Sequence, residues 1–310
     1  MNLIKPPPHL KISQWADKFR LLSTESSSEA GKFETARAIF QKEIMDSIND
    51  PTITEVVVMS CSQIGKTEIL LNSIGYYIHY APAPILIVHP TLEMARAWSQ
   101  DRLAPMIRDT EILKQKVAEV KSKDSGNTVL HKIFDGGHIT ACGANSPASL
   151  ASRPIKIVLC DEIDRYPPTA GSEGDPVMLA KRRSATFWDS KLVLTSTPTV
   201  KGASAIEEAY EQSDQRKFYV PCHKCKKKQV FKWSQVQWAK DKPQTVRYIC
   251  EKCETKWTDL QRITNISKGQ WKAREKFNGR AGFRINGLYS VWVTMEEAAR
   301  EFLMVKKQPE

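Results

Sequence analysis

Residues 60–67 have the sequence SCSQIGKT, which fits the phosphate-binding loop pattern GxxxxGK[ST] except that Ser60 occupies the first glycine position. In such a loop Lys66 brings a positive charge to the β- and γ-phosphates of a nucleotide, and the Thr67 hydroxyl is a ligand for Mg²⁺. Gly65 lets the backbone approach the phosphates where a side chain would intrude. The loop residues expected to contact the nucleotide are Ser60, Ser62, Gln63, Ile64, Gly65, Lys66 and Thr67.

Two adjacent carboxylates supply the acidic groups that phosphoryl transfer requires. The apolar run 157–160 leads directly into Asp161 and Glu162. Asp161 suits the Mg²⁺ shell, and Glu162 suits the catalytic role of orienting and polarising the attacking water. An exposed acidic turn after a core strand is the alternative interpretation, and the phosphate-binding loop in the same chain favours the catalytic one.

A third polar strand end is the segment LTSTP, residues 194–198. The Thr197 hydroxyl is placed to contact the γ-phosphate or the attacking water. By itself this segment indicates only a strand followed by a turn. Its significance comes from the order in which the loop, the acidic pair and this segment follow one another.

The elements that must position these side chains alternate between strand and helix. Apolar runs predict strands at 55–59, 85–88, 133–134, 138–142, 155–160 and 191–195, and helical spacing of apolar residues predicts helices at 32–48, 66–80, 93–107 and 295–307. This alternation predicts an α/β fold with helices on both faces of a mostly parallel sheet. Ligands bind at the carboxyl ends of the strands in such sheets, and all three motifs lie there.

Two CxxC pairs separated by 24 residues are formed by Cys222, Cys225, Cys250 and Cys253. Four thiolates at this spacing give Zn²⁺ a closed tetrahedral shell of the structural type, so we predict a small zinc-ribbon-like β module. His223 lies inside the first pair and is not needed as a ligand. Two redox dithiols are the alternative interpretation.

The net charge of +11 is concentrated in one part of the chain, because residues 216–258 hold 12 Lys and Arg against 3 acidic residues. A polyanionic partner such as nucleic acid is the natural inference. Residues 226–228 and Lys232 are candidates for nonspecific contacts with DNA phosphates. Protein docking and a merely solvated lysine-rich surface are the alternatives.

Taken together, these motifs resemble the large terminase subunits of tailed bacteriophages, in particular the lambda-like branch. The resemblance covers about residues 32–307, and a serine at the first loop position is usual in that family. It implies a P-loop NTPase of the RecA-like, ASCE type, in which Glu162 is catalytic beside the Walker B residue Asp161. The segments that carry it are 55–59 with 62–68, 89–91 with 95–96, 152–154, 161–167 and 195–198.

The resemblance also implies the cofactors ATP and Mg²⁺ and the packaging of double-stranded DNA into a preformed capsid. Implied partners are a small terminase subunit and a portal protein, with a homo-oligomeric ring forming in the cytoplasm of the bacterial host. Ser62 stands where many large terminases have an arginine. Arg153 is therefore the candidate catalytic arginine, acting on the ATP of a neighbouring subunit, and pairing with the acidic edge of the sheet is its other interpretation.

On this basis the chain divides into an N-terminal extension (1–31), an ATPase domain (32–218), a zinc module (219–258) and a C-terminal segment (259–310). The nuclease carboxylates of the family fall beyond residue 310, so we expect ATP hydrolysis without DNA cleavage. The apolar runs are far shorter than the roughly 20 residues of a membrane span.

Two other functions remain open. A superfamily 2 type helicase or translocase needs a second RecA-like domain, for which little chain is left. A noncatalytic zinc-ribbon DNA-binding protein would carry a degenerate ATPase, and the presence of both Lys66 and Glu162 argues against it.

Overall fold

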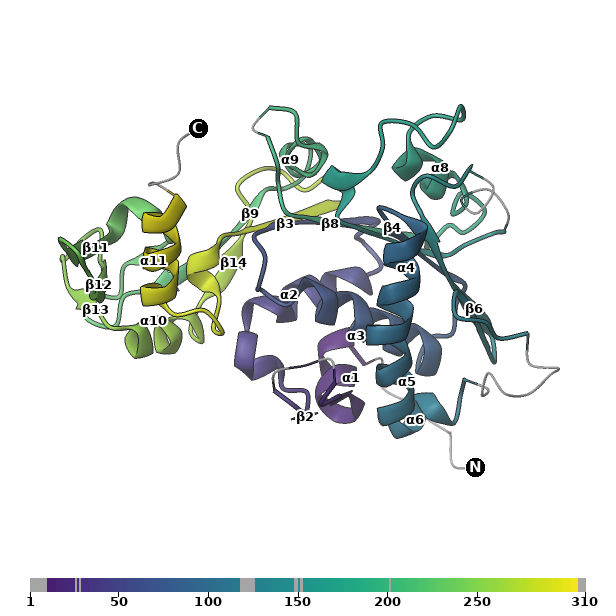
Figure 1. Cartoon of the computed structure of the whole chain (residues 1–310), viewed down its shortest axis with the longest axis horizontal. Helices are drawn as coiled ribbons and strands as arrows, with labels where there is room; N and C mark the ends of the chain where they lie inside the picture. The colour runs from purple at the N-terminus through teal and green to yellow at the C-terminus, as the bar shows by residue number, and fades with distance from the viewer. Residues whose placement is uncertain are drawn as a thin grey trace, which may run out of the picture.

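The computed structural model describes residues 10–25, 27, 29–117, 126–147, 150, 153–200 and 202–305. A ten-stranded sheet crosses the molecule, and helices cover both of its faces (Figure 1). Its strands are β3 (Glu55–Ser60), β4 (Ile85–His89), β5 (His131–Phe134), β6 (Gly137–Gly143), β7 (Ile157–Asp161), β8 (Lys191–Ser196), β9 (Arg216–Pro221), β10 (Lys228–Gln229), β14 (Gln270–Lys272) and β15 (Arg280–Ile285).

The strand order is β10-β9-β15-β3-β8-β7-β4-β6-β5, and β14 pairs with β9 outside this path. Neighbouring strands from β9 to β6 run parallel, whereas β5, β10 and β14 are antiparallel to their partners. The predicted α/β fold with a mostly parallel sheet is confirmed. Strand β8 lies between the strand that enters the phosphate-binding loop and the strand that carries the acidic pair.

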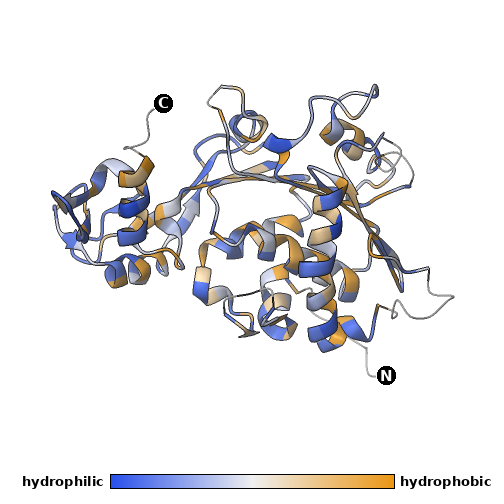
Figure 2. Cartoon of the chain, viewed as in Figure 1, coloured by the Kyte–Doolittle hydropathy of each residue, from blue (hydrophilic) through white to orange (hydrophobic). Residues whose placement is uncertain are grey.

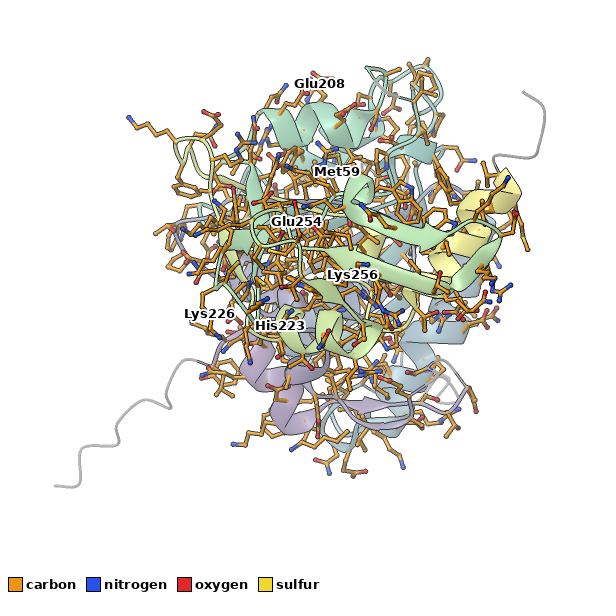
Figure 3. All side chains as sticks on the ribbon, turned by 90° about the vertical axis from the view of Figure 1, so that its left-hand side faces the viewer. Met59, Glu208, His223, Lys226, Glu254 and Lys256 are labelled. Carbon is orange, nitrogen blue, oxygen red and sulfur yellow. The ribbon has the colours of Figure 1, made fainter. Side chains whose placement is uncertain are left out.

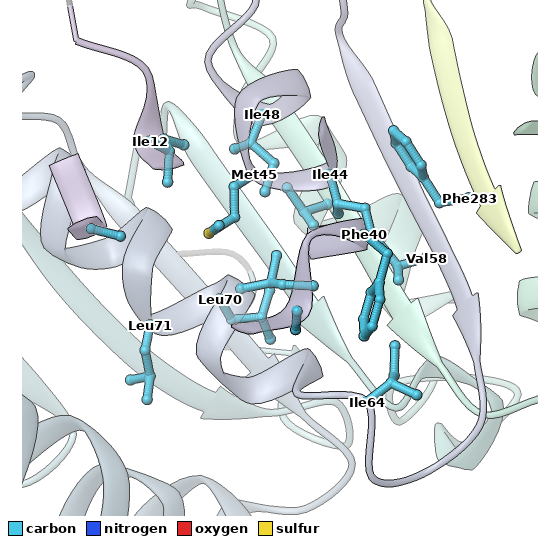
Figure 4. Close-up of a cluster of buried hydrophobic side chains, with 14 of the residues drawn as sticks. Ile12, Phe40, Ile44, Met45, Ile48, Val58, Ile64, Leu70, Leu71 and Phe283 are labelled. Carbon is cyan, nitrogen blue, oxygen red and sulfur yellow. The ribbon is translucent and has the colours of Figure 1, made fainter. Parts of the chain in front are cut away.

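The two-residue period of β3 divides the hydrophobic core between the two faces of the sheet. Val56 and Val58 point toward one face, while Val57 and Met59 point toward the other. Figure 4 shows Val58 packed among side chains of the first face, including Phe40, Ile44 and Leu70. All six residues of β3 are buried, as expected for a strand covered on both sides.

Helices on the Val58 face are α1 (Ile12–Phe19), α2 (Phe40–Ile48), α3 (Lys66–His79), α4 (Leu92–Trp98), α5 (Ala104–Asp109) and α6 (Glu111–Lys114). The opposite face carries α8 (Pro176–Arg182) and α9 (Ala205–Glu211). Apolar residues gather along the sheet and on the helix surfaces turned toward it (Figure 2). Among the described residues, no helix is long and apolar enough to cross a membrane.

A smaller unit lies at one end of the large sheet, connected to it through β9 and β14 (Figure 1). It contains a three-stranded antiparallel sheet flanked by two helices, and its centre is formed by Phe231, Tyr248 and Trp257, each at most 1% exposed. Its elements are β11 (Val236–Ala239), β12 (Lys242–Ile249), β13 (Lys256–Trp257), α10 (Asp259–Ile266) and α11 (Met295–Val305).

Three expected helices differ from those observed. The segment expected as a helix at 32–48 begins with a 3-10 turn, Thr35–Ala38, and α2 starts only at Phe40. The expected helix 93–107 is interrupted by the wide turn Ser99–Leu103, because Pro105 cannot donate a backbone hydrogen bond and its ring crowds the preceding turn. Helix α11 is described to Val305, and residues 306–307 of the expected helix lie outside the described residues.

The chain returns to the large sheet after the cysteine-rich segment. The expected division instead places residues 259–310 in a C-terminal segment separate from the ATPase domain 32–218. Strand β15 pairs with β3 over its whole length, from Arg280 beside Glu55 to Ile285 beside Ser60. The sequence RAGFRI conceals this strand because two arginines and a glycine interrupt its apolar residues. The expected N-terminal extension likewise contributes to the core, since Trp15 of α1 is fully buried and lies against Gly75 of α3.

Candidate functional site

The phosphate-binding loop connects β3 to α3 and depends on a glycine at its end. Gly65 has a φ of 77°, a left-handed conformation that L side chains rarely adopt. A Cβ at this position would lie 2.2 Å from Gln41 Nε2, so any other residue would displace the Gln41 side chain and would be strained at this φ. Gln63 also has a positive φ of 61°. The loop therefore bends sharply enough for the N-terminus of α3 to face the cavity, where its N–H groups attract anions.

Two hydrogen bonds from distant elements hold the carbonyl groups of this loop. Gln41 Nε2 of α2 donates to the Ile64 carbonyl over 2.8 Å, and Ser290 Oγ donates to the Gln63 carbonyl over 2.8 Å. The side chains of the loop differ in how far they are exposed to the cavity. Ile64 is fully buried and packs near Phe40 (Figure 4), so its side chain cannot touch a nucleotide.

Five of the seven predicted loop residues line one cavity of about 750 Å³: Ser62, Gln63, Gly65, Lys66 and Thr67. Ser60 does not, because it is 1% exposed and its hydroxyl donates to the neighbouring Cys61 carbonyl. Ser60 and Ile64 are therefore left with their backbone groups, and not their side chains, for the predicted contact with a nucleotide. A larger hollow of about 1020 Å³ lies between α2 and β14 and contains none of the motif residues.

Side chains from all three sequence motifs meet at Lys66. Its Nζ lies 2.8 Å from Glu162 Oε1 and donates to Thr197 Oγ1 over 2.7 Å. The Thr197 N–H donates to the other oxygen of Glu162 over 3.4 Å. Glu162 has φ 54° and ψ 50°, a left-handed conformation that costs a residue with a side chain about 1–3 kcal/mol and is concentrated at functional sites.

Asp161 lies at the end of β7, deeper than Glu162. Thr195 of the neighbouring β8 donates to Asp161 Oδ1 over 2.6 Å. Burial raises the pKa of Asp161, the Thr195 hydrogen bond opposes that rise, and the adjacent Glu162 charge adds to it. His89 Nδ1 is 3.8 Å from Asp161 Oδ2, but burial lowers the pKa of His89 to about 4. His89 is therefore neutral at pH 7 and does not compensate the carboxylate charge.

The turn that follows the acidic pair is tied to the end of β8. Asp164 accepts hydrogen bonds from the backbone N–H groups of Thr199 and Ile206, at 2.9 and 2.8 Å. Its own N–H donates to Ser196 Oγ over 3.2 Å. These hydrogen bonds connect the turn after β7 to the segment after β8. The turn is therefore held in place, unlike the exposed acidic turn that was the alternative interpretation of Asp161 and Glu162.

Several residues of this cavity carry no recognisable signal in the sequence. Arg37 forms a bidentate ion pair with Glu29, with N···O distances of 2.6 to 3.1 Å. Trp292 Nε1 donates to Glu29 Oε2 over 3.2 Å, and its ring would lie 3.3 Å from a Cβ at Gly65. All three side chains line the cavity, although the chain positions that supply them are far apart.

The segment that contains Ser290 and Trp292 is fixed by a buried arginine of α10. Arg262 is 1% exposed, and its guanidinium donates to the carbonyl groups of Leu288, Ser290 and Val293. It also pairs with Asp259 over 2.9 Å. Helix α10 begins directly after β13 of the cysteine-rich unit, so this unit and the phosphate-binding loop are linked by a continuous series of contacts.

Arg153 lies apart from the other predicted site residues. It lines a separate cavity of about 190 Å³, and its NH1 lies 3.2 Å from His131 Nε2. This partner is a histidine, and among the described residues no ion pair joins Arg153 to a carboxylate at the edge of the sheet. Arg153 is not among the residues that line the cavity at Lys66.

The four predicted cysteines converge on one point. Their sulfur atoms all lie within 4.8 Å of one another, and they form the only group of three or more His, Cys, Asp or Glu ligands among the described residues. Separations are 3.8 Å for Cys222 to Cys253 and 3.7 Å for Cys225 to Cys250. A tetrahedral Zn²⁺ site with Zn–S of about 2.3 Å requires sulfur atoms about 3.8 Å apart.

The backbone around the cysteines has the same turn twice. The N–H of Lys226 donates to the Cys222 carbonyl over 2.9 Å, and the N–H of Glu254 donates to the Cys250 carbonyl over 3.0 Å. Both Lys226 and Glu254, labelled in Figure 3, have left-handed φ angles of 61° and 55°. His223 instead lies beside Asn265 Nδ2 at 3.0 Å, in keeping with its predicted place outside the ligand set.

Comparison with known proteins identifies the family to which this chain belongs. Residues 27–271 match the family model for the phage terminase large subunit gpA, ATPase domain. The chain belongs to this family. Among curated proteins, the terminase large subunit of Enterobacteria phage P21 is 30% identical over 282 residues, which cover 87% of this chain and 43% of the relative. The predicted resemblance to terminase large subunits is confirmed, and the chain spans less than half of that relative.

Two solved terminase structures are also similar. The large terminase of bacteriophage HK97 has 13% identity and a TM-score of 0.50, covering 64% of this chain and 40% of that chain. The large terminase ATPase domain of Thermus phage P74-26 has 13% identity and a TM-score of 0.48, covering 87% of this chain and 88% of that chain. At 13% identity, the HK97 match shows a shared fold.

Proposed function

We propose that this terminase-family chain hydrolyses ATP and couples hydrolysis to the movement of double-stranded DNA into a capsid. The convergence of Lys66, Glu162 and Thr197 supports this proposal most strongly. It unites a cation, a carboxylate and a hydroxyl from three strand ends within 2.7 to 3.4 Å. A phosphate-binding loop alone would serve binding, whereas the carboxylate beside it serves hydrolysis.

Each residue has a defined part in the proposed reaction. Lys66 and the N-terminus of α3 bind the β- and γ-phosphates. Glu162 orients the attacking water and draws its proton, while Thr197 holds the Glu162 carboxylate through its backbone N–H. Thr67, which lines the cavity, and Asp161, at the end of β7, are the proposed Mg²⁺ ligands, because hydroxyl and carboxylate oxygens are donors that Mg²⁺ prefers. The bound ion would neutralise charge that develops on the phosphates.

A structural zinc ion is the proposed occupant of the cysteine cluster. The sulfur separations and the repeated turn described above fit a tetrahedral ion, and redox dithiols would not require two identical turns. Cys222, Cys225, Cys250 and Cys253 would fill all four positions and leave none for chemistry. The ion would then stabilise a unit whose own apolar core is small.

The other partners follow from family membership and from the position of Arg153. We propose that the chain acts in a homo-oligomeric ring with a portal protein and a small terminase subunit, in the cytoplasm of the bacterial host. Arg153 lies outside its own nucleotide cavity, so its proposed catalytic role requires the ATP of a neighbouring subunit.

DNA cleavage is not part of the proposed activity of this chain. Three carboxylates after the cysteine cluster have partners within the fold: Asp259 pairs with Arg262, Glu296 pairs with Arg300, and Glu297 accepts from the N–H of Thr294. A two-metal nuclease needs carboxylates that converge on metals about 4 Å apart. Supercoiled plasmid incubated with the chain and Mn²⁺ is expected to remain supercoiled, and relaxation or linearisation would contradict this.

Phosphate release from ATP, measured with and without linear duplex DNA, tests the proposed function. A translocating motor is expected to hydrolyse ATP several-fold faster when duplex is present. A helicase would in addition separate the strands of a forked duplex. A noncatalytic DNA-binding protein would release no phosphate under either condition, and that result would overturn the proposal.

A further inference from the structure

Three basic residues occupy neighbouring positions on three adjacent strands near the cysteine-rich unit. Lys272 of β14 is directly opposite Lys217 of β9, and Lys217 is paired in register with Arg284 of β15. We refer to Lys272, Lys217 and Arg284 as the cationic row. Cross-strand neighbours on one face of a sheet lie close together, so like charges in these positions repel one another.

The alternation of side chains places the whole row on one face of the sheet. The intervening residues Phe218, Trp271 and Phe283 are buried and pack beneath α2, where the Trp271 indole donates to the Phe40 carbonyl. The row therefore points to the opposite face, which is the face that carries α9. Helix α9 covers β3, β8 and β15, and strands β9 and β14 extend beyond it toward the cysteine-rich unit (Figure 1).

Basic residues elsewhere on these strands have acidic partners, whereas the row does not. Arg216 pairs with Asp214 and Glu43, and Arg280 pairs with Glu55. Within the described part of the chain, no ion pair involves any member of the row. Lys272 and Arg284 are exposed, and Lys217 is half-buried.

Further cations surround the row. Burial lowers the pKa of Lys217, and the nearby charges of Arg274, Arg284 and Lys232 lower it further. Lys232 is 3.8 Å from Glu251, a contact too long and too exposed to cancel the local excess. The acidic residues nearest to the row in sequence are Asp214, which pairs with Arg216, and Glu275, next to Arg274. A site that accumulates repulsion of this kind is suited to a partner that brings several negative charges.

We propose that the cationic row binds the phosphate backbone of duplex DNA. Two interstrand spacings of about 4.8 Å give the row a length of roughly 10 Å, which is long enough to contact more than one phosphate of a DNA strand. The inference rests on the proposed function and assigns the DNA contact to this sheet face instead of residues 226–228.

The residue types favour backbone contact over base stacking. Tyr219, the aromatic side chain on this face, is half-buried, and Lys272 Nζ lies 6.0 Å from its ring centroid. Single-strand binding relies on open aromatic platforms, while duplex binding relies on cations that neutralise phosphates. The row is also one strand away from the phosphate-binding loop, because Arg284 pairs with Met59 of β3.

Binding of the full chain to a fluorescein-labelled 30-base-pair duplex, without nucleotide and over a range of salt concentrations, tests the proposal. The variant combines Lys217→Gln, Lys272→Gln and Arg284→Gln. A matched control combines Lys18→Gln, Lys114→Gln and Lys116→Gln, which remove the same charge from α1 and the α6 region on the other face of the sheet. Circular dichroism and DNA-free ATP hydrolysis check that each protein is folded.

The row variant is expected to bind about tenfold or more weakly, and the slope of log K against log salt should fall by about one for each lost phosphate contact. The control should keep the wild-type slope. If both variants behave alike, or if the wild-type chain binds no duplex at low salt, the proposal is overturned.

If the triple variant does not fold, a variant of the two exposed residues alone, Lys272→Gln with Arg284→Gln, serves in its place. An unchanged slope of log K against log salt in that protein also overturns the proposal. Selective loss of binding to an acidic polypeptide, with duplex binding intact, would assign the row to a protein partner and contradict the DNA assignment. The DNA-free ATPase rate separates this inference from the proposed function. Wild-type hydrolysis with an unchanged DNA slope rejects only the row, while absent wild-type hydrolysis rejects the function itself.

Discussion

Ser290 Oγ donates a 2.8 Å hydrogen bond to the carbonyl of Gln63, so a residue that follows the cysteine-rich unit holds the phosphate-binding loop. Arg262 fixes the same segment by donating to the Ser290 carbonyl. The loop is therefore held by a residue that lies far outside the motif of residues 60–67. The conformation of the proposed nucleotide site thus depends on residues near the C-terminus as well as on the loop itself.

Ser290→Ala is expected to raise the KM for ATP by roughly two- to tenfold with a smaller change in kcat. The reason is that one hydrogen bond contributes about 0.5–1.5 kcal/mol and positions the loop without touching the reacting atoms. Steady-state phosphate release measures both constants. Ser267→Ala, which removes a hydroxyl from the end of α10, is the control and should leave KM unchanged. An unaltered KM in Ser290→Ala would show that the tether is dispensable.

Glu162→Gln is expected to bind ATP with near wild-type affinity while hydrolysis falls by about two to four orders of magnitude. The substitution preserves the shape of the side chain and leaves one oxygen to accept from Lys66 or the Thr197 N–H, but it replaces the other oxygen with an amide nitrogen and removes the base. Equilibrium binding of a fluorescent ATP analogue and single-turnover hydrolysis separate the two effects. Loss of binding together with hydrolysis would assign Glu162 to the structure of the loop.

Asp161→Asn is expected to stabilise the fold at pH 7 by a few degrees in Tm and to abolish Mg²⁺-dependent hydrolysis. Burial raises the pKa of Asp161 in the folded chain, so protonation favours folding. That contribution is fully present below the unfolded pKa of about 3.9 and is lost as pH rises through the folded value, which leaves a buried charge at pH 7.

Thermal unfolding at pH 7 and at pH 4 measures this effect. The gain in Tm should shrink at the lower pH, where more of the wild-type carboxyl is protonated. Asp101→Asn, at an exposed position, should change Tm little at either pH. A lower Tm for Asp161→Asn at pH 7 would mean that the ionised carboxylate stabilises the fold.

Purified chain is expected to contain one zinc per molecule, and Cys225→Ser or Cys250→Ser should remove it. Without the ion, hydrogen exchange should increase in residues 220–257, because four sulfur atoms lose the group that holds them together. The ATPase core should remain folded. Cys61→Ser, outside the cluster, is the control for loss of a thiol. Metal-free wild-type protein, or unchanged exchange in both variants, would rule out a structural zinc site.

Much of the site was predictable because its main residues lie in short contiguous motifs. Apolar runs identify β3, β7 and β8, and each run ends in residues that contact one another in the fold. The spacing of the two CxxC pairs likewise predicts that the four cysteines lie together. Local sequence is sufficient where a strand and the polar residues after it act as one unit.

The remaining parts depend on tertiary pairing that local patterns do not encode. Strand β15 lies beside β3 although Gly282 and Arg284 weaken its apolar alternation. Gln41 and Trp292 reach the phosphate-binding loop from opposite ends of the chain. Their types are ordinary for buried polar and aromatic residues, so only the folded chain shows that they surround one cavity.

The central claim is that ATP is hydrolysed at the site formed by Lys66 and Glu162, and Mg²⁺-dependent phosphate release by wild type and Lys66→Ala tests it most directly. We expect measurable turnover by the wild-type chain and none by the variant, whose melting curve should stay close to that of wild type because Lys66 lies at the surface of a cavity. Equal phosphate release by the two proteins would contradict the claim.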